Sequence, residues 1–395
     1  MNRPALNICL IGQKFMGKAH SNAFLKADKF FTLPLRPVMY SVAARDADEL
    51  QAFAGRWGWR HPITDWRAAV TDPAVQFVDV ASPNHLHAEM AIAALRAGKH
   101  VACEKPLAGT LADARKMRDA ARKARGKTFV WYNYRRVPAV ALARDLVQSG
   151  RIGRIYHVRA FYLQDWGKPD VPLIWRFQKK YTGSGAMGDL AAHIVDMMRF
   201  VTGQEIVEVA GAIMETFIKR RSIPSGGTGG GIADAAGSAT KTGRSDVDDT
   251  TLFLARTSKG AVASFEATRL ATGNQNRNGL EVNGDRGSLR FDFEEMNHLR
   301  FYDATAQRKT QGWTNIMVTH APDHEYVGHW WPDAHIIGYE HTFVNQVADM
   351  VNAIGGIAPP VPIPDFEDAY KTQQVLEAAT IAAQERRPVK LSEIK

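Results

Sequence analysis

Apolar runs of strand length recur through the first third of the chain, and the stretches between them carry apolar residues at helical spacing. Each run is nearly continuous, which is typical of a strand buried on both faces of a parallel sheet. The runs lie at residues 6–12, 36–44, 75–82, 100–105 and 128–133. This alternation of strands and helices predicts a doubly wound, parallel α/β sheet over residues 1–133.

A different pattern begins at about residue 134. The apolar runs become longer and partly alternate with polar residues, and a tight glycine turn interrupts the last of them. These runs lie at residues 155–163, 261–270 and 280–293. Partial alternation predicts antiparallel strands with one face turned to solvent or ligand. We therefore expect residues 134–395 to form an α/β domain on a large, mostly antiparallel open sheet.

Two further segments fall inside this second domain. Residues 222–243 contain seven glycines and no aromatic residue, which predicts a mobile loop or lid. A helix is expected near residues 365–386, where apolar residues recur along one face. That apolar stripe consists of Val375, Leu376, Ala379, Ala382 and Ala383.

The composition fits a soluble protein of two domains. The chain has 395 residues, of which 45% are hydrophobic and 23% charged, and is too long for one ordinary core. No apolar run approaches the length of about 18 residues that a membrane span needs, and the first run lacks the cleavage site of a secretory signal. Cys9 and Cys103 lie in apolar runs and form no disulfide framework, which favours a cytoplasmic location.

The net charge of +9 raises the question of nucleic acid. The 50 lysines and arginines are spread along the chain, however, and no basic block is interleaved with aromatic residues. We expect neither nucleic-acid binding nor membrane binding. The excess of positive charge favours a small anionic ligand, such as the phosphates of a nucleotide.

The first apolar run ends in a glycine turn, "LIGQKFMGKAH", that resembles a dinucleotide fingerprint. Gly12 and Gly17 stand where such a turn needs a tight bend and a close contact of helix and strand. Lys14 replaces the middle glycine, which normally lets the backbone approach the pyrophosphate. An ammonium group beside two phosphates is favourable, so the turn predicts a Rossmann-type nucleotide site with a charge contact from Lys14.

The end of the second apolar run bears on the choice of cofactor. An acidic residue there binds the adenosine ribose of NAD, and an arginine accommodates the 2′-phosphate of NADP. Arg45 stands at this place and favours NADP, whereas Asp46, one position later, would serve NAD if the register shifts. Both cofactors remain open.

Two more strand ends carry candidate residues. Pro83 and Asn84 follow the run 75–82, at the edge of the sheet where doubly wound folds bind ligands. His85 and His87 are two positions apart and cannot share a helix face, so no metal pair is expected. Lys105 precedes a proline at the end of another run, which directs it out of the sheet toward a nicotinamide, where it can relay a proton.

The segment 183–200 places Asp189 and His193 four positions apart, which puts them on one face of a helix. A carboxylate that orients an imidazole suits the oxidation of a hydroxyl to a ketone, since the imidazole takes the alcohol proton while a hydride leaves for the cofactor. A buried pair that only holds the helix to the sheet is the alternative interpretation.

Together with the glycine turn, the "EKP" and Asp-x-x-x-His motifs resemble the glucose–fructose oxidoreductase/inositol dehydrogenase/MocA family. The similarity covers nearly the whole chain and is strongest to the levoglucosan-dehydrogenase-like sugar dehydrogenases within it. It is carried by "GKAHS" (17–21), "PNHLHAE" (83–89), "CEKPL" (103–107), "NYRR" (133–136), "YLQDW" (162–166) and "WRFQK" (175–179).

This resemblance implies roles for individual residues. The catalytic set corresponds to Lys105, Asp189 and His193, and the Lys105–Pro106 bond is expected to be cis. The implied sugar-binding residues are Arg136, Tyr162, Gln164, Trp166, Trp175 and Arg176. The candidate cofactor-binding residues are Gly12, Lys14, Phe15, Met16, Gly17, Arg45, Ser82, Pro83, Asn84, His87, Glu104 and Lys105. Lys14 and Arg45 depart from the family pattern, and the closest resemblance favours NAD.

The expected activity is NAD(P)-dependent oxidation of a ring hydroxyl, with that at C3 as the candidate, in a sugar, anhydrosugar, glycoside or cyclic polyol. Two alternatives stand beside it: a glycosidase that retains NAD and acts by transient oxidation, and a non-catalytic NADP-binding protein. No metal is expected. An open sheet with an apolar face predicts a homo-oligomer, either a dimer or a tetramer.

Overall fold

The computed structural model describes residues 3–224 and 241–394, and the chain divides into two compact units. Unit 1 comprises Met1–Arg136 and Gly338–Tyr370, and unit 2 comprises Val137–Ile337 and Lys371–Lys395. The chain thus returns to unit 1 after its passage through unit 2, which a single division after residue 133 does not describe. Most of the glycine-rich segment, residues 225–240, lies outside the described residues, so the predicted loop or lid remains a prediction.

Six strands form the sheet of unit 1, and every neighbouring pair is parallel. In chain order they are β1 (Ala5–Ile11), β2 (Arg36–Ala43), β3 (His61–Ile63), β4 (Phe77–Val80), β5 (His100–Cys103) and β6 (Thr128–Val130). Their order in the sheet is β3-β2-β1-β4-β5-β6, which confirms the predicted doubly wound sheet. The order reverses between β1 and β4, and ligands of such folds bind at the carboxyl ends of the strands beside that point.

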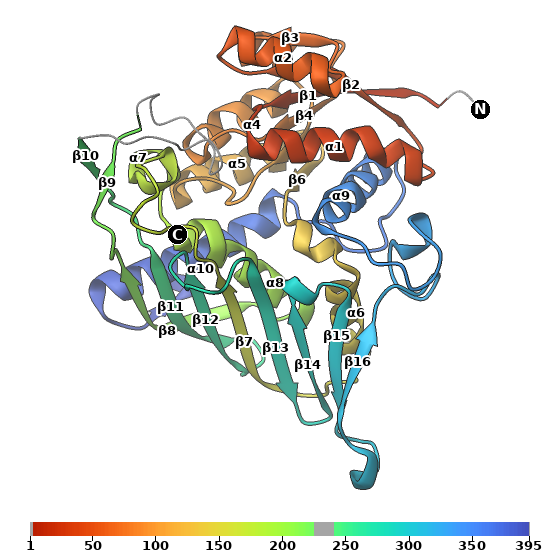
Figure 1. The fold of residues 1–395 in the computed structure, drawn as a ribbon, viewed down its shortest axis with the longest axis vertical. Helices are drawn as coiled ribbons and strands as arrows, with labels where there is room; N and C mark the ends of the chain where they lie inside the picture. The colour runs from red at the N-terminus through yellow and green to blue at the C-terminus, as the bar shows by residue number, and fades with distance from the viewer. Residues whose placement is uncertain (1–2, 225–240, 395) are drawn as a thin grey trace. The chain divides into compact units, whose positions relative to one another are not determined.

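Helices connect these strands and flank the sheet (Figure 1). They are α1 (Phe15–Phe30), α2 (Ala47–Trp57), α3 (Trp66–Thr71), α4 (His87–Arg96), α5 (Leu111–Lys123) and, from the returning segment, α9 (Tyr339–Ile354). Helix α9 buries several polar side chains, among them Asn345 and Gln346, which donate to the backbone carbonyls of Arg136 and Val130. These bonds attach the returning segment to the end of the parallel sheet.

A nine-stranded sheet forms the body of unit 2, in the order β16-β15-β14-β13-β7-β12-β11-β8-β17. Its strands are β7 (Ile155–Leu163), β8 (Ile206–Glu215), β11 (Thr250–Thr257), β12 (Val262–Thr268), β13 (Arg277–Gly284), β14 (Gly287–Asp292), β15 (His298–Asp303), β16 (Trp313–Met317) and β17 (Val389–Lys390). A separate pair consists of β9 (Arg220–Ser222) and β10 (Thr242–Arg244). Only the β7–β12 pairing in the large sheet is parallel, so the sheet is mostly antiparallel, as predicted.

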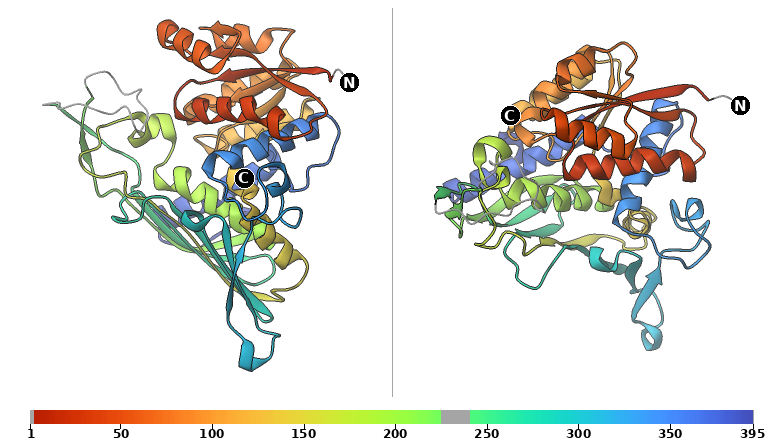
Figure 2. Two further views of the ribbon diagram at one scale, coloured as in Figure 1. Left: turned by 45° about the vertical axis from the view of Figure 1, so that its right-hand side comes forward. Right: turned by 45° about the horizontal axis from the view of Figure 1, so that its top comes forward.

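Helices cover one face of the large sheet and leave the other exposed (Figure 2). The covering helices are α6 (Pro138–Gln148) and α8 (Ala192–Thr202), which lie against β7, β13, β14 and β15. Along β11, buried and exposed residues alternate strictly, and Leu254 on the open face is 59% exposed. The long terminal helix α10 (Phe366–Glu385) was predicted at this place.

Within residues 3–224 and 241–394, no helix is both long and apolar enough to cross a membrane. In the same ranges, no group of three or more His, Cys, Asp or Glu side chains is placed to hold a metal ion.

Candidate functional site

The glycine turn after β1 is closely packed in unit 1. Gly12 has φ +121°, and a Cβ atom there would lie 2.5 Å from the carbonyl oxygen of Ala81, at the end of β4. A Cβ atom at Gly17 would lie 2.3 Å from the carbonyl oxygen of Gly12. Both contacts are with backbone atoms, which do not yield easily, so both positions require glycine. The turn has the close contact of strand and helix that a dinucleotide turn needs.

Lys14 occupies the N-cap of α1 with φ −83°, which any residue can adopt, so the turn does not require a glycine there. Its Nζ lies 2.7 Å from Oε2 of Glu49, which also accepts a bond from Gln13. The side chains of Lys14 and Glu49 are about half exposed, and exposed pairs of this kind contribute little stability. The ammonium group is therefore available to another anion, and its contact with phosphate remains a prediction. Phe15 is 50% exposed and Met16 half-buried at the start of α1.

The two residues that bear on cofactor choice have different surroundings. Arg45 is exposed directly after β2. The Asp46 carboxylate accepts a bond from the backbone amide of Glu49 and caps α2. Both residues are exposed, but only the Asp46 side chain is engaged as a helix cap.

His87 lies between the strand end after β4 and the turn after β5. Its ring is buried, with Nε2 2.9 Å from the carbonyl of Ser82 and Nδ1 3.2 Å from that of Pro106. Burial lowers the pKa of His87, and a neutral ring carries one N–H, which donates to one side only. His87 thus lies between two segments and donates to one of them, and because it is fully buried we no longer propose it as a cofactor contact. Asn84 is also buried, and Pro83 lies beside it.

Lys105 lies half-buried after β5, and the Lys105–Pro106 bond is cis, as predicted. Its backbone amide donates to Oε2 of Glu104 at 3.0 Å. The buried Glu104 carboxylate is engaged inside the protein, so we propose a supporting role for it instead of a cofactor contact.

Behind Glu104 lies a histidine that the sequence analysis did not single out. The ring of His20, on α1, is fully buried, with Nδ1 2.9 Å from Asp79 on β4 and Nε2 3.0 Å from Glu104. It stacks on Trp131 at a centroid distance of 3.9 Å, and the indole N–H donates to Asp79. Burial alone would lower the pKa of His20, but the charges and hydrogen bonds of Asp79 and Glu104 outweigh it and raise this pKa to about 9.

This raised pKa predicts a loss of stability at alkaline pH. The imidazolium is favoured in the folded state, so its contribution is fully present below about pH 6.5, the value of an unfolded histidine, and is lost as the pH rises through about 9. The free energy of unfolding, measured by urea denaturation between pH 6 and 10, should fall across this window. His20→Gln should flatten that fall, and an equal fall in this variant would contradict the assignment.

In unit 2, a π-helical turn, η4 (Met187–Ala191), leads directly into α8. The Asp248 carboxylate accepts the backbone amides of Gly185 at 2.6 Å and Met187 at 2.7 Å. A Cβ atom at Gly185 would lie 1.8 Å from the carbonyl oxygen of Asp248. These contacts fix the start of the turn, which carries Asp189. The predicted regular helix face of Asp189 and His193 is thus interrupted between the two residues.

Two arginines hold the Asp189 carboxylate, one at each oxygen. Arg269 lies 3.0 Å from Oδ2 and Arg176 lies 3.4 Å from Oδ1. Arg269 is fully buried and also donates to the backbone carbonyls of Arg176 and Gly185. Its guanidinium lies 5.0 Å from the ring centroid of Trp166, a cation–π contact. The carboxylate is therefore held in one orientation.

His193 is 7% exposed, and its ring centroid lies 5.8 Å from that of Tyr162 on β7. A chain of hydrogen bonds extends from there. The Tyr162 hydroxyl and the Gln164 amide donate to Oδ1 of Asn276 at 2.7 and 2.8 Å, and the Trp166 indole donates to Gln164 at 2.8 Å. Three predicted sugar-binding residues thus belong to one network. Arg176, which contacts Asp189, also lies with its guanidinium 4.7 Å from the ring centroid of Trp175.

Arg136 has different surroundings. It belongs to unit 1, is fully buried, and pairs with Asp349 of α9 at 3.0 Å. Its two terminal nitrogens donate to the backbone carbonyls of Pro362 and Val361. A guanidinium held in this way attaches the returning segment to unit 1, and we no longer propose Arg136 as a sugar contact.

Arg269 and Asn276 are residues of this region that sequence reasoning missed. Arg269 lies at the end of the predicted strand 261–270, and Asn276 comes six positions after that strand, within the polar run 274–278. The one sequence signal for Arg269 was a charged residue at the end of an apolar strand. Nothing in the spacing connects it with Asp189, which lies 80 positions earlier.

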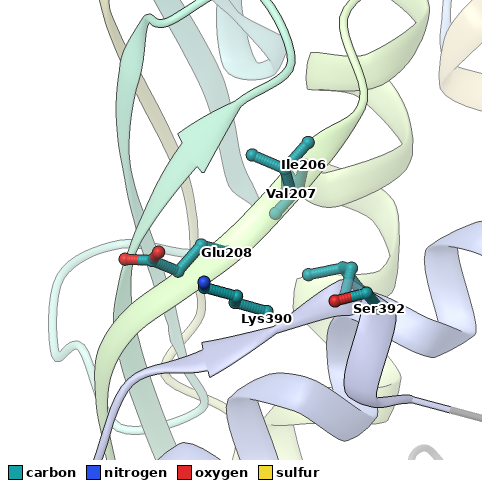
Figure 3. Close-up of a pocket in the computed structure, with 6 residues that line it drawn as sticks. Ile206, Val207, Glu208, Lys390 and Ser392 are labelled. Atoms are coloured by element: carbon teal, nitrogen blue, oxygen red, sulfur yellow. The ribbon is translucent and has the colours of Figure 1, made fainter.

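A cavity of about 350 Å³ lies elsewhere in unit 2, at the edge formed by β8 and β17. Figure 3 shows its lining, which consists of Ile206, Val207, Glu208, Lys390, Leu391 and Ser392. None of the candidate residues lines it, so we do not assign it to the site.

The residues around the glycine turn fit a dinucleotide. The turn has no room for a side chain at Gly12 or Gly17, and a backbone without side chains lets a pyrophosphate approach closely. The buried Ser82 hydroxyl, at the end of β4, has no protein hydrogen-bond partner among the described residues. A buried hydroxyl of this kind is usually satisfied by a ligand or water. Gly12, Gly17, Ser82 and Lys14 would hold the cofactor.

Comparisons with known proteins match two separate stretches of the chain. Residues 6–133 match the model of an oxidoreductase family with an NAD-binding Rossmann fold, and residues 140–290 match the GFO/IDH/MocA C-terminal domain. The chain is 40% identical to a levoglucosan dehydrogenase of Pseudarthrobacter phenanthrenivorans over 383 residues, which is 96% of each chain.

Two solved structures are similar over almost the full length. An oxidoreductase domain protein from Kribbella flavida is 48% identical, with a TM-score of 0.91 over 98% of this chain and 99% of that one. A levoglucosan dehydrogenase in complex with NADH and L-sorbose is 39% identical, with a TM-score of 0.90 over 98% and 99%.

Proposed function

Because this chain belongs to the GFO/IDH/MocA oxidoreductase family, we propose that it oxidises a ring hydroxyl of a sugar, anhydrosugar, glycoside or cyclic polyol to a ketone with NAD(P). We place anhydrosugars first, since a relative matched over 96% of both chains is a levoglucosan dehydrogenase. The observation that carries the proposal is the arrangement in unit 2 of His193 and the arginine-held Asp189 with a network of aromatic and amide side chains.

A bound nicotinamide supplies the hydride acceptor for this reaction. His193 acts as the general base and takes the proton of the reacting hydroxyl. Lys105 donates a hydrogen bond to the same oxygen and stabilises its developing negative charge. Asp189, held by Arg269 and Arg176, fixes the orientation of the hydroxyl or of the imidazole. The carbinol loses one proton and one hydride, and the hydride carries both electrons of the oxidation.

The surroundings of His193 suit a pyranose. Aromatic faces such as Tyr162 and Trp166 stack on the C–H surface of a sugar ring. Gln164 and Asn276 supply amide groups that pair with hydroxyls, which would otherwise be buried without partners. Their mutual hydrogen bonds hold these side chains in place before the sugar binds.

The proposal is tested by a spectrophotometric screen of levoglucosan, glucose, inositols and simple glycosides against NAD and NADP separately. We expect NADH or NADPH formation that saturates with at least one sugar. Release of an aglycone without net NADH would indicate the NAD-retaining glycosidase instead. Cofactor binding without turnover of any of these compounds would contradict the proposed function.

We propose that Arg45 allows the chain to use NADP as well as NAD. A guanidinium pairs with a 2′-phosphate through two hydrogen bonds, and such charged bonds contribute about 1.5–3 kcal/mol. Arg45→Asp should therefore lower kcat/KM for NADP by roughly 10- to 100-fold and leave that for NAD near wild type. Arg36→Asp, at the exposed start of the same strand, is the matched control. An unchanged NADP-to-NAD ratio in Arg45→Asp would reject this role.

We propose that the open face of the large sheet pairs with a second copy of this chain to form a homo-oligomer. Ile213 and Leu252 are register partners on this face and are 65% and 42% exposed, with Leu254 beside them. Leu254→Asp buries a charge in such an interface and should lower the molecular mass measured by light scattering. Ile357→Asp, at an exposed position of unit 1, should not. A wild-type chain that is already monomeric would exclude the proposal.

We also propose a cytoplasmic location. Cys9 and Cys103 are free and buried, and burial raises the pKa of both thiols. Two free thiols fit a reducing compartment, in which no disulfide is needed.

A further inference from the structure

A cluster of three buried ionisable groups lies in unit 1 behind Lys105. His20 comes from α1, Asp79 from β4 and Glu104 from the residue after β5. His20 and Asp79 are 0% exposed and Glu104 is 5% exposed. Burying three ionisable groups costs desolvation free energy, so packing alone does not explain why they lie here.

The chemistry of the ring determines its charge. Each ring nitrogen of His20 faces a carboxylate, and a neutral imidazole could donate to only one of them. To donate to both carboxylates, the ring must carry both protons. The other titratable groups near these carboxylates are His87, whose pKa burial lowers, and the thiols of Cys9 on β1 and Cys103 on β5, which burial keeps protonated. The geometry therefore calls for an imidazolium between the two carboxylates.

The cluster is connected to Lys105 through Glu104. One carboxylate oxygen of Glu104 accepts from His20 and the other accepts from the backbone amide of Lys105 at 3.0 Å. This amide belongs to Lys105 itself, whose side chain carries the proposed catalytic ammonium. A change at His20 thus reaches the Lys105 backbone through a single side chain.

We propose that His20 is a positioning residue of the redox site: as an imidazolium it clamps Glu104, and Glu104 in turn holds the Lys105 backbone in the orientation that presents the ammonium group. This inference rests on the proposed function for the role of Lys105. Asp79 on β4 and Trp131, the residue after β6, anchor the clamp to the parallel sheet.

The test uses His20→Gln, which keeps an amide donor but no charge, and Glu104→Gln, which leaves the His20–Asp79 pair intact. Each should lower kcat by about 10- to 100-fold, as expected for a misplaced catalytic group, with little change in the sugar KM. Amide hydrogen exchange of the peptide containing Lys105 should become faster in both variants, while the peptides of α1 keep their protection. His100→Gln, a half-buried histidine of the same unit, is the control and should change neither measurement.

Each outcome decides between the accounts. Wild-type kcat and wild-type exchange at Lys105 in His20→Gln would overturn the proposal. If His20→Gln instead loses protection throughout α1, the histidine is needed for folding, and Glu104→Gln decides by the same two measurements. If the wild-type chain oxidises no sugar, the proposed function fails. The contact from His20 through Glu104 to Lys105 is then tested by hydrogen exchange of the Lys105 peptide alone.

Discussion

Replacing His193 by asparagine is expected to lower kcat for sugar oxidation by about 10²- to 10⁴-fold, the usual contribution of a general base. Asparagine keeps a polar side chain of similar size but cannot take the hydroxyl proton at neutral pH. The sugar KM should stay near wild type, because the network of Tyr162, Gln164 and Asn276 is unchanged. Initial rates of NADH formation at saturating sugar measure the effect.

His335→Asn serves as the matched control, since His335 is an exposed histidine of the same unit. It should retain wild-type rates. The melting temperature of His193→Asn should be compared with that of the wild type, so that loss of fold is not taken for loss of a base. A kcat within the range of the control would remove His193 from the chemical step.

Arg269→Met is expected to destabilise the protein by about 3–5 kcal/mol, as is usual when one partner of a buried ion pair is removed. Arg269 is fully buried, and without it the Asp189 carboxylate loses one ion pair and keeps the one with Arg176. The backbone carbonyls of Arg176 and Gly185 also lose the hydrogen bonds that Arg269 donates. The free energy of unfolding from urea denaturation measures the loss. We also expect a lower kcat, because Asp189 loses its fixed orientation.

The control for this change is Arg256→Met. Arg256 is 62% exposed in its side chain and lies 3.7 Å from Glu208, and exposed pairs contribute about 1 kcal/mol or less. If Arg269→Met costs no more than Arg256→Met, the buried pair does not hold Asp189 in place.

The parallel sheet of unit 1 could be predicted because strands buried on both faces leave continuous apolar runs. The run 6–12 became β1 and the run 128–133 contains β6. The strand β3 was missed, since its residues are exposed or only partly buried and form no continuous apolar run. The return of residues 338–370 to unit 1 was also missed. It depends on buried polar contacts such as Arg136–Asp349, and these join residues more than 200 positions apart.

Predictions for the site differ in the same way. Residues named by a local motif, such as the glycine turn and the lysine before Pro106, lie in the local structures that their motifs predict. The spacing of Asp189 and His193 predicted a regular helix, but a π-helical turn contains Asp189, because Asp248 binds the amides that precede it. Residues that act through others, such as His20 and Arg269, carry no motif of their own. Their partners are brought to them only by the fold.

The central claim is that Lys105 and His193 act on one hydroxyl of a bound sugar. The most direct test is a crystal structure of the protein with NADH and levoglucosan, or with the sugar that turns over best in the screen. The account predicts that Lys105 Nζ and a ring nitrogen of His193 both lie within hydrogen-bond reach, about 2.6–3.2 Å, of the same sugar oxygen. A complex in which either group lies far from that oxygen, with the sugar bound at the nicotinamide, would contradict it.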